Sequence, residues 1–393
     1  MKVKAAVLQE MGRPTPYAKS KPIIIEELEL APPHDDEVLV KLLYAGLCHS
    51  DLSVINASRP RPTPMALGHE AVGRIQQVGK NVDNVQVGDI VSCVFVPSCG
   101  TCDSCRTGRP ATCTTGAKAN GAGLLLCGQS HLSRTTQVNK PNDSKMIHHL
   151  LGVAAFSTYS VMNKNSVVKI DPSIPPQYAA VFGCAVITGV GAVVNTAKIE
   201  FGASVAIVGL GGVGFCALLG ALAAGASNII VVDLEQSKLD LAKKLGASHG
   251  VLSTKDISLD NLIQSVKQLT QQGRGVDYAF EMAGSGPTLK VAYGITRPGG
   301  TTVTAGLPHP ETQFSVSQVT ITAEERTLKG SYLGSCVPTR DIPRYVQLFK
   351  EGRLPVDKLI SGIITLDQIN EGFDQLDQGK VIRLLLKLHD DEE

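Results

Sequence analysis

The chain has 393 residues, 43% of them hydrophobic, and a formal net charge of +1 at pH 7. That length is sufficient for two domains of ordinary size, and the hydrophobic content is that of a globular protein. The balanced charge argues against a nucleic-acid partner. No long apolar run opens the sequence, so we expect no signal peptide and a cytoplasmic location, where ten cysteines stay reduced or bind metal.

The first hundred residues alternate short apolar runs, rich in β-branched side chains, with glycine and proline. This composition is typical of strands joined by turns. We predict strands over residues 3–7, 38–43, 72–78 and 85–91. The N-terminal part is therefore expected to be a β-rich body whose loops carry functional side chains.

Two short segments on these loops contain residue types that bind metals. They are Cys48-His49-Ser50-Asp51 and Gly68-His69-Glu70, and a further candidate is Cys184. Thiolate sulfur and imidazole nitrogen suit Zn²⁺, and a catalytic zinc has three protein ligands and one open position. Cys48, His69 and Cys184 would form such a site if the fold brings them together. Taken singly, each is also explained as an ordinary buried or structural residue.

Four further cysteines are closely spaced, at Cys99, Cys102, Cys105 and Cys113. Four thiolates close a tetrahedral shell, so we interpret residues 99–113 as a lobe around a structural zinc. An iron–sulfur centre also takes four cysteines, and two disulfides would account for them in an oxidising compartment. We favour zinc, because a short lobe inside a β-rich domain needs a cross-link more than a redox centre.

Residues 114–145 are polar and glycine-rich and have no clear periodicity. The segment is long for a loop without secondary structure, so we expect a functional or interface lobe. Four residues in or beside it are interpreted as surface or interface residues: Cys127, His131, His148 and His149.

From residue 204 onward the pattern is that of a nucleotide-binding fold. A predicted strand over 204–208 leads to a glycine-rich turn, a helix over 215–224 and a strand over 228–232 that ends at Asp233. The turn consists of Gly209, Leu210, Gly211, Gly212, Val213 and Gly214. Such a turn between strand and helix, with an acidic residue about 20 positions later, is the fingerprint of dinucleotide binding.

Each part of this fingerprint has a physical role. The glycines permit a tight turn, close approach of a pyrophosphate to the helix N-terminus, and close packing of helix on strand. Asp233 would accept hydrogen bonds from the adenosine ribose, and its charge would repel a 2′-phosphate, which favours NAD over NADP. The many glycines in this most apolar part of the chain also argue against a membrane span, so no membrane partner is expected.

The alternation of helix and strand continues to the end of this region. Helices are predicted over 237–245, 260–271 and 287–293, and strands over 276–280, 300–305 and 328–332. This order predicts a doubly wound parallel sheet and hence an α/β fold class.

The tail contains predicted helices over 340–350 and 367–376 and a strand over 382–388. It is expected to rejoin the first domain, because the nucleotide fold already has its strands. The domains are therefore placed at residues 1–186 and 187–333, with 334–393 returning to the first.

Together these motifs resemble those of the zinc-dependent medium-chain alcohol dehydrogenases, over essentially the whole chain. The likeness extends to residues 369–373 and Arg383 near the C-terminus. It implies a GroES-like β-rich catalytic domain, a Rossmann domain that binds NAD, and two zinc ions per chain, one catalytic and one structural. It also implies a homodimer, since relatives that keep a segment like 114–145 are dimers.

The resemblance assigns a role to each candidate residue. The catalytic zinc would be bound by Cys48, His69 and Cys184, with Glu70 behind it and Asp51 orienting His69. The structural zinc would be bound by Cys99, Cys102, Cys105 and Cys113. Cofactor contacts would come from His49 and Arg383 to the pyrophosphate, Thr188 and Val213 to the nicotinamide, and Asp233 and Lys238 to the ribose.

The implied reaction transfers a hydride from an alcohol to NAD and gives an aldehyde or ketone. Zinc would act as a Lewis acid that stabilises the substrate as an alkoxide, and Ser50 would hydrogen-bond the substrate oxygen and start the proton's path. In many members a histidine three positions later continues that path; here the position is Ser53, so water or His49 would take over. Phe95 resembles a ring that lines the substrate pocket.

The expected substrates are ordinary apolar or aromatic alcohols, primary or secondary. No acidic residue lies between Asp51 and Glu70, where glutathione-dependent formaldehyde dehydrogenases carry recognition carboxylates. A zinc polyol dehydrogenase is one alternative, although such relatives often have Glu where this chain has Cys184. A non-enzymatic nucleotide-binding protein of the same superfamily is another, but it would lack the zinc cysteines.

Overall fold

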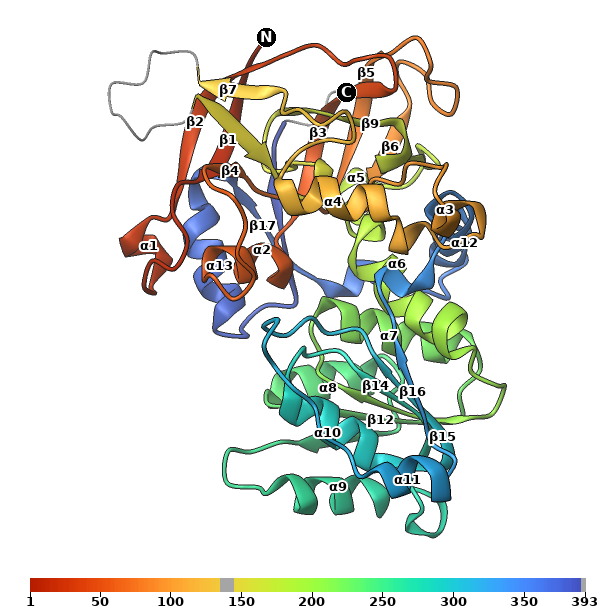
Figure 1. Ribbon diagram of the computed structural model, residues 1–393. Helices are drawn as coiled ribbons and strands as arrows, with labels where there is room; N and C mark the ends of the chain where they lie inside the picture. Colours follow the sequence, from red (N-terminus) through yellow and green to blue (C-terminus); the bar gives the residue numbers. More distant parts are fainter. Residues whose placement is uncertain (135–144, 390–393) are drawn as a thin grey trace. The chain divides into compact units, whose positions relative to one another are not determined.

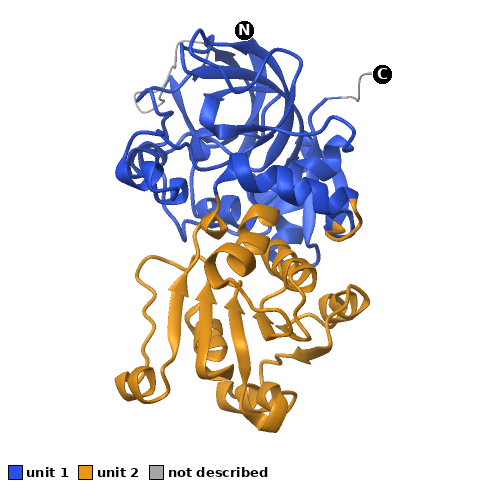
Figure 2. Ribbon diagram, turned by 90° about the vertical axis from the view of Figure 1, so that its right-hand side faces the viewer, with its two compact units in different colours: residues 1–184, 337–350, 356–393 blue, residues 185–336, 351–355 orange. Residues whose placement is uncertain are grey.

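The chain divides into two compact units in the computed structural model, which describes residues 1–134 and 145–389 (Figure 2). Unit 1 comprises residues 1–184, 337–350 and 356–393, and unit 2 comprises residues 185–336 and 351–355. These bounds lie close to the expected ones. The short return of residues 351–355 to unit 2 was not predicted from the sequence.

Unit 1 contains a small closed barrel (Figure 1). Its strands, in order of pairing, are β1 (Lys2–Leu8), β2 (Ile23–Leu30), β7 (Leu132–Arg134), β8 (Met146–His149) and β4 (Met65–Ala66). Alternate residues of β1, among them Val3, Ala5 and Val7, point into a core shared with Leu28 and Ile147. The period of two is the pattern of a strand with one buried face.

A second sheet of unit 1 carries the N- and C-terminal parts of the chain side by side. Its path runs through β10 (Val167–Lys169), β6 (Ile90–Cys93), β5 (Ala71–Val78), β3 (Glu37–Gly46), β18 (Arg383–Lys387) and β17 (Ile360–Thr365), and β9 (Tyr159–Asn163) also pairs with β3. Strand β18 is antiparallel to β3 and parallel to β17. The C-terminal tail thus continues the sheet that contains β3.

The helices of unit 1 are short except near the C-terminus. They are α1 (Tyr17–Ser20), α2 (His49–Ile55), α3 (Asp103–Arg106), α4 (Thr114–Ala122), α5 (Pro176–Ala179), α12 (Pro338–Lys350) and α13 (Ile369–Asp377).

One prediction for unit 1 needs correction. The strand expected over 85–91 begins only at Ile90, because the positive φ of Gly88 (+93°) makes the preceding residues a turn. The segment 114–145 contains α4 and β7 where it is described, and its function as an interface lobe stays a prediction. Residues 135–144 of that segment lie outside the described residues.

Unit 2 is built on a six-stranded, wholly parallel sheet. The strand order is β13 (His249–Leu252), β12 (Asn228–Asp233), β11 (Ser204–Val208), β14 (Val276–Glu281), β15 (Thr296–Thr304) and β16 (Thr327–Gly330). In chain order this is 3-2-1-4-5-6, the order of a doubly wound dinucleotide-binding fold. The predicted α/β class and Rossmann topology are confirmed.

Helices cover the sheet of unit 2 and close its apolar core. They are α6 (Ala185–Gly191), α7 (Gly212–Ala223), α8 (Gln236–Lys244), α9 (Leu259–Lys267), α10 (Gly286–Ile295) and α11 (Gln318–Ala323). Helix α7 packs against β11, and α10 packs against β14 and β15. The core includes Val208, Val232, Ile263 and Ile295. Because both faces are covered, the strands read as continuous apolar runs.

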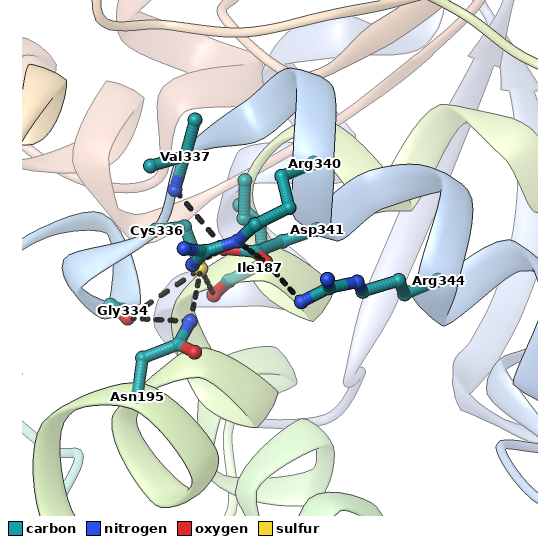
Figure 3. A network of polar contacts seen from close by, with 8 residues as sticks. All are labelled: Ile187, Asn195, Gly334, Cys336, Val337, Arg340, Asp341 and Arg344. Carbon is teal, nitrogen blue, oxygen red and sulfur yellow. Dashed lines mark hydrogen bonds and ion pairs between the residues drawn. The ribbon is translucent and has the colours of Figure 1, made fainter. Parts of the chain in front are cut away.

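The chain passes from unit 2 to unit 1 between Cys336 and Val337, and a polar network surrounds each side of the junction (Figure 3). In unit 2, Nδ2 of Asn195 donates to the carbonyl of Gly334 and to Sγ of Cys336, at 3.4 and 3.1 Å. In unit 1, the buried carboxylate of Asp341 accepts the Val337 N–H at 3.0 Å and pairs with Arg340. The residues on either side of the junction are thus held by hydrogen bonds within their own unit.

Within the described residues no single helix is long and apolar enough to cross a membrane. One bent pair of helices, over residues 176–183 and 185–197, passes that test by length and composition alone.

Candidate functional site

Unit 1 brings together the three residues predicted as ligands of a catalytic metal. Cys48 precedes α2 in an extended conformation, His69 follows Gly68, and Cys184 ends unit 1 before α6. Their donor atoms all lie within 4.8 Å of one another, and Sγ of Cys184 is 3.4 Å from Nε2 of His69. All three side chains are buried. Residues distant in the sequence therefore form one compact donor set.

The spacing of this donor set fits a metal of the zinc class. With bonds of about 2.3 Å to sulfur and about 2.05 Å to nitrogen, a tetrahedral ion holds these two donors about 3.6 Å apart. The distance of 3.4 Å between Cys184 and His69 is close to that value. Two sulfurs and one nitrogen leave a fourth position for another ligand.

Asp51 fixes the orientation of His69. Its carboxylate lies 3.2 Å from Nδ1 of the imidazole and accepts the backbone N–H of Gly68 at 2.9 Å. A proton held on Nδ1 by the carboxylate leaves the lone pair of Nε2 free on the side of Cys184. The expected role of Asp51 as the residue that orients His69 is consistent with these contacts.

The two cysteines of the donor set have strongly different pKa values without a metal. The hydrogen bond with Cys184, aided by the charge of Arg383, lowers the pKa of the Cys48 thiol well below its usual range despite burial. The same hydrogen bond, together with burial, raises the pKa of Cys184. One thiolate is therefore ready for a cation, and binding of a metal would release the proton of the other.

Glu70 and Arg383 form a buried ion pair beside this cluster. Nε of Arg383 lies 3.3 Å from Oε1 of Glu70, and its Nη1 donates to the carbonyl of Leu47, next to Cys48. Glu70 does not belong to the group of donor atoms that lie within 4.8 Å of one another. These contacts thus hold the segments that contain Cys48 and His69 in place. A contact of Arg383 with a pyrophosphate stays a prediction.

The remaining catalytic candidates lie on the first turn of α2. His49 is exposed and Ser50 is partly buried, and both directly follow Cys48. Oγ of Ser53 donates to the carbonyl of Ser50 at 2.9 Å, so Ser53 closes the helical turn. The ring of Phe95 meets that of His69 edge to face, with centroids 5.5 Å apart. An aromatic surface therefore adjoins the donor set.

The four cysteines of the 99–113 lobe come together in space, with all four sulfur atoms within 4.8 Å of one another. Sγ of Cys102 lies 3.6 Å from that of Cys105 and 3.8 Å from that of Cys113, close to the edge of about 3.8 Å of a tetrahedron with 2.3 Å metal–sulfur bonds. Cys99 completes the group of four. All ten cysteines of the chain are free, so the alternative of two disulfides is not supported.

Hydrogen bonds prepare this lobe for a cation. The Thr101 hydroxyl lowers the pKa of Cys99 to about 5 in spite of some burial, and burial raises that of Cys105 to about 12. The backbone N–H groups of Cys99 and Gly116 both donate to Sγ of Cys113 at 3.3 Å. Backbone donors directed at sulfur stabilise thiolates, which are the form that binds metal.

The glycine-rich turn of unit 2 has the geometry that a bound pyrophosphate requires. Gly209 has a φ of +96°, and a Cβ on Gly214 would lie 1.9 Å from the carbonyl oxygen of Gly209. A Cβ on Gly211 would meet nothing within 4 Å. Gly209 thus makes the turn, Gly214 allows the tight packing of α7, and Gly211 faces open space at the helix N-terminus, where phosphate groups bind.

The other predicted cofactor residues of unit 2 lie on β12 and on helices α6, α7 and α8. Oδ2 of Asp233, at the end of β12, accepts the N–H of Leu210 at 2.6 Å, so it is fixed beside the turn. Lys238 lies in the first turn of α8, and Val213 follows Gly212 at the start of α7. Oγ1 of Thr188 is buried without a hydrogen-bond partner among the described residues, as expected of a group that awaits a ligand.

One group of potential ligands was missed by the sequence reasoning. His34, Glu37, Cys127 and His131 also have donor atoms that lie within 4.8 Å of one another. His131 and His149 are buried, so their interpretation as surface residues is wrong. Sequence signals did exist, because His34 and Glu37 flank a turn before an apolar strand, but nothing in the local pattern connects them with residues 127–131.

Two family models match the chain. Residues 34–172 match the alcohol dehydrogenase GroES-like domain, and residues 212–351 match the zinc-binding dehydrogenase domain.

Solved structures agree with the family models. An alcohol dehydrogenase zinc-binding domain protein from Burkholderia ambifaria is 32% identical, with 99% of each chain covered and a TM-score of 0.89. A benzyl alcohol dehydrogenase from Acinetobacter calcoaceticus is 31% identical, with 99% of this chain and 100% of that chain covered and a TM-score of 0.88. A zinc-binding dehydrogenase from Sinorhizobium meliloti, bound to NADP, shares the fold at 22% identity, with 98% and 99% covered and a TM-score of 0.77.

Proposed function

Because the chain belongs to the zinc-dependent medium-chain alcohol dehydrogenase family, we propose that it oxidises an alcohol to an aldehyde or ketone with NAD as hydride acceptor. The observation that carries this proposal is the convergence of Cys48, His69 and Cys184 into one buried donor set with a fourth position to spare. A structural metal site has no such position.

In this proposal the three donors hold a zinc ion, which when bound supplies a Lewis acid for the substrate oxygen. Asp51 keeps His69 in the tautomer that presents Nε2, and the Glu70–Arg383 pair holds the loop that contains Cys48. Ser50, two residues after Cys48, accepts the proton of the substrate hydroxyl and passes it outward. Since Ser53 donates to the Ser50 carbonyl, the path leaves through water or His49.

The four-cysteine lobe holds a second, structural zinc in this account. Its four thiol groups occupy every position of a tetrahedral ion, so it provides no place for a substrate. Two zinc ions per chain are therefore proposed, one for each donor set.

NAD is the proposed cofactor, in preference to NADP. The carboxylate of Asp233 is held next to Leu210 in the phosphate-binding turn. A fixed negative charge at this point favours the two hydroxyl groups of the NAD ribose and repels the 2′-phosphate of NADP. Lys238 would contact the same ribose, and Thr188 and Val213 would pack against the nicotinamide.

Apolar or aromatic alcohols, primary or secondary, are the proposed substrates. The edge-to-face contact of Phe95 with His69 places an aromatic ring beside the donor set. The likeness to a benzyl alcohol dehydrogenase at 31% identity points in the same direction. A zinc polyol dehydrogenase is less well supported, because a cysteine rather than a glutamate completes the donor set.

A cytoplasmic homodimer is the proposed assembly. In the described sheet of unit 2, β16 is an edge strand, and its Leu328 is 44% exposed. Helix α11 adds the exposed side chains of Val319 and Ile321. An unpaired strand edge with apolar neighbours is a surface on which a second copy can continue the sheet.

A panel of alcohols tests the proposed function. Benzyl alcohol, a linear primary alcohol, a secondary alcohol and sorbitol are each assayed with NAD and with NADP. We expect the highest kcat/KM with benzyl alcohol and NAD. A preference for sorbitol would favour the polyol alternative, and a preparation that binds NADH but holds no zinc and turns over none of the alcohols would favour the non-enzymatic one.

A further inference from the structure

A second mixed donor set lies in unit 1, apart from the residues discussed for catalysis. It joins His34 and Glu37, on either side of the turn at which β3 begins, to the segment before β7, which contains Cys127 and His131. One donor atom from each of the four residues lies within 4.8 Å of the other three. These two segments are far apart in the sequence, so the fold has brought the donors together.

The carboxylate of Glu37 is the centre of this set. Its Oε2 lies 2.9 Å from Nε2 of His131 and 3.8 Å from Nδ1 of His34, and it accepts the His34 backbone N–H at 2.9 Å. A tetrahedral ion with nitrogen and oxygen ligands at about 2.0–2.1 Å holds such atoms about 3.4 Å apart. The two distances bracket that value. A small shift of side chains would therefore allow four-coordinate binding.

Burial divides the set into an inner and an outer half. The side chains of Glu37 and His131 are 3% and 2% exposed, whereas that of His34 is 52% exposed and Cys127 is also exposed. An ion could thus enter from solvent and displace only water and the proton of a thiol. This half-open arrangement differs from the buried catalytic set.

The carboxylate of Glu37 is held by the His34 N–H and lies against the buried His131, so its oxygens are directed into the set and are available to a cation.

We propose that His34, Glu37, Cys127 and His131 form a third metal site, which takes one Zn²⁺ or similar borderline transition-metal ion. Zinc binds imidazole nitrogen, thiolate sulfur and carboxylate oxygen, whereas calcium and magnesium require oxygen ligands, of which this set offers one carboxylate. The ion would fasten residues 127–131 to the turn before β3, and so act on the barrel and not on the reaction. Because two of its ligands are exposed, it is held less tightly than the two zinc ions of the proposed function.

Cobalt titration of the protein in its two-zinc state tests this site. Protein dialysed against metal-free buffer is mixed with Co²⁺, and bound metal is counted by elemental analysis while the absorbance of the thiolate-to-cobalt transition is recorded. We expect one additional ion per chain, with a thiolate band that Cys127→Ser removes. The double variant His34→Gln/Cys127→Ser should lose at least about tenfold in affinity for the added ion.

Controls separate this site from the other two. Both substituted side chains are exposed, so the double variant should keep its fold, its two zinc ions and its alcohol oxidation, and His309→Gln serves as a matched change of another exposed histidine. Uptake of the additional ion by the double variant with unchanged affinity would overturn the proposal. Absence of any additional ion in the unmodified protein would overturn it as well, whether or not the protein oxidises alcohols.

Discussion

Nε of Arg383 lies 3.3 Å from Oε1 of Glu70, and both side chains are buried. The pair joins β18, near the C-terminus, to the loop that follows β4 and contains the proposed zinc ligand His69. A Cβ on Gly46, at the end of β3, would lie only 2.1 Å from the same Glu70 oxygen, so the local backbone is shaped around this carboxylate. The C-terminal strand β18 thus contributes both strand pairing with β3 and the charge of Arg383 to the surroundings of His69.

We expect Glu70→Gln to lower the free energy of unfolding by about 3–5 kcal/mol. The substitution keeps the shape of the side chain but leaves Arg383 buried without its counter-charge, and breaking one partner of a buried pair has this typical effect. Urea unfolding of the two proteins measures the difference. Glu10→Gln, at a 71% exposed side chain in a surface pair, is the control and should change little. An equal, small effect of both substitutions would contradict the role of the pair.

Alanine substitution of two glycines in the phosphate-binding turn should affect different properties, NADH binding for Gly211 and stability for Gly214. Gly211→Ala places a methyl group in open space, so we expect an unchanged melting temperature and at least about tenfold weaker binding of NADH, because the methyl group occupies the path of the pyrophosphate. Gly214→Ala places it 1.9 Å from a carbonyl oxygen and should destabilise unit 2 itself. Calorimetric melting and NADH fluorescence titration measure both effects. Normal NADH binding by Gly211→Ala would argue against a pyrophosphate at this turn.

The preference for NAD should depend on Asp233. We expect kcat/KM with NAD to exceed that with NADP by at least about tenfold, which corresponds to about 1.4 kcal/mol. Asp233→Ser should narrow this ratio, since it removes the charge that opposes the 2′-phosphate. Steady-state kinetics with both cofactors provide the measurement. Equal efficiency of the unmodified enzyme with the two cofactors would refute this role of the carboxylate.

The proposed dimer should depend on the edge strand β16. We expect light scattering to give twice the chain mass of 41.5 kDa, and Leu328→Glu to shift the protein toward the monomer, because a charge opposes pairing of strand edges. Ile363→Glu, at another exposed apolar side chain but in unit 1, is the control and should stay dimeric. A mass near four times 41.5 kDa would contradict the dimer.

The nucleotide-binding part was predictable because its signals are local. Its elements follow one another in the chain: a strand over 204–208, the glycine turn with the helix after it, and the strand that ends at Asp233. In the structure they are β11, the turn that leads into α7, and β12. Strand β13 was not predicted, because its four residues are half-exposed and include a glycine, so no apolar run marks it. Local patterns therefore predicted the elements with strong periodicity and missed the weak one.

The metal sites were predictable in part. The four cysteines of the lobe are close in sequence, so their spacing alone indicates a closed site. The three proposed ligands of the catalytic zinc could be named as candidates from their residue types, but only the resemblance to a known family indicated that they meet, because they are far apart in the sequence and the fold brings Cys184 to His69. Neither the resemblance nor local spacing pointed to His34 and His131, whose contact depends on the register of the barrel strands.

The central claim is that Cys48, His69 and Cys184 hold the zinc that serves the reaction, while the four-cysteine lobe serves the fold. Its most direct test is zinc content and alcohol oxidation measured together on the unmodified protein and on Cys184→Ala, after dialysis against metal-free buffer. The account predicts two zinc ions per chain in the unmodified protein. In the variant it predicts one zinc ion, no alcohol oxidation, and NADH binding and melting close to those of the unmodified protein. Turnover like that of the unmodified enzyme in Cys184→Ala would contradict the account.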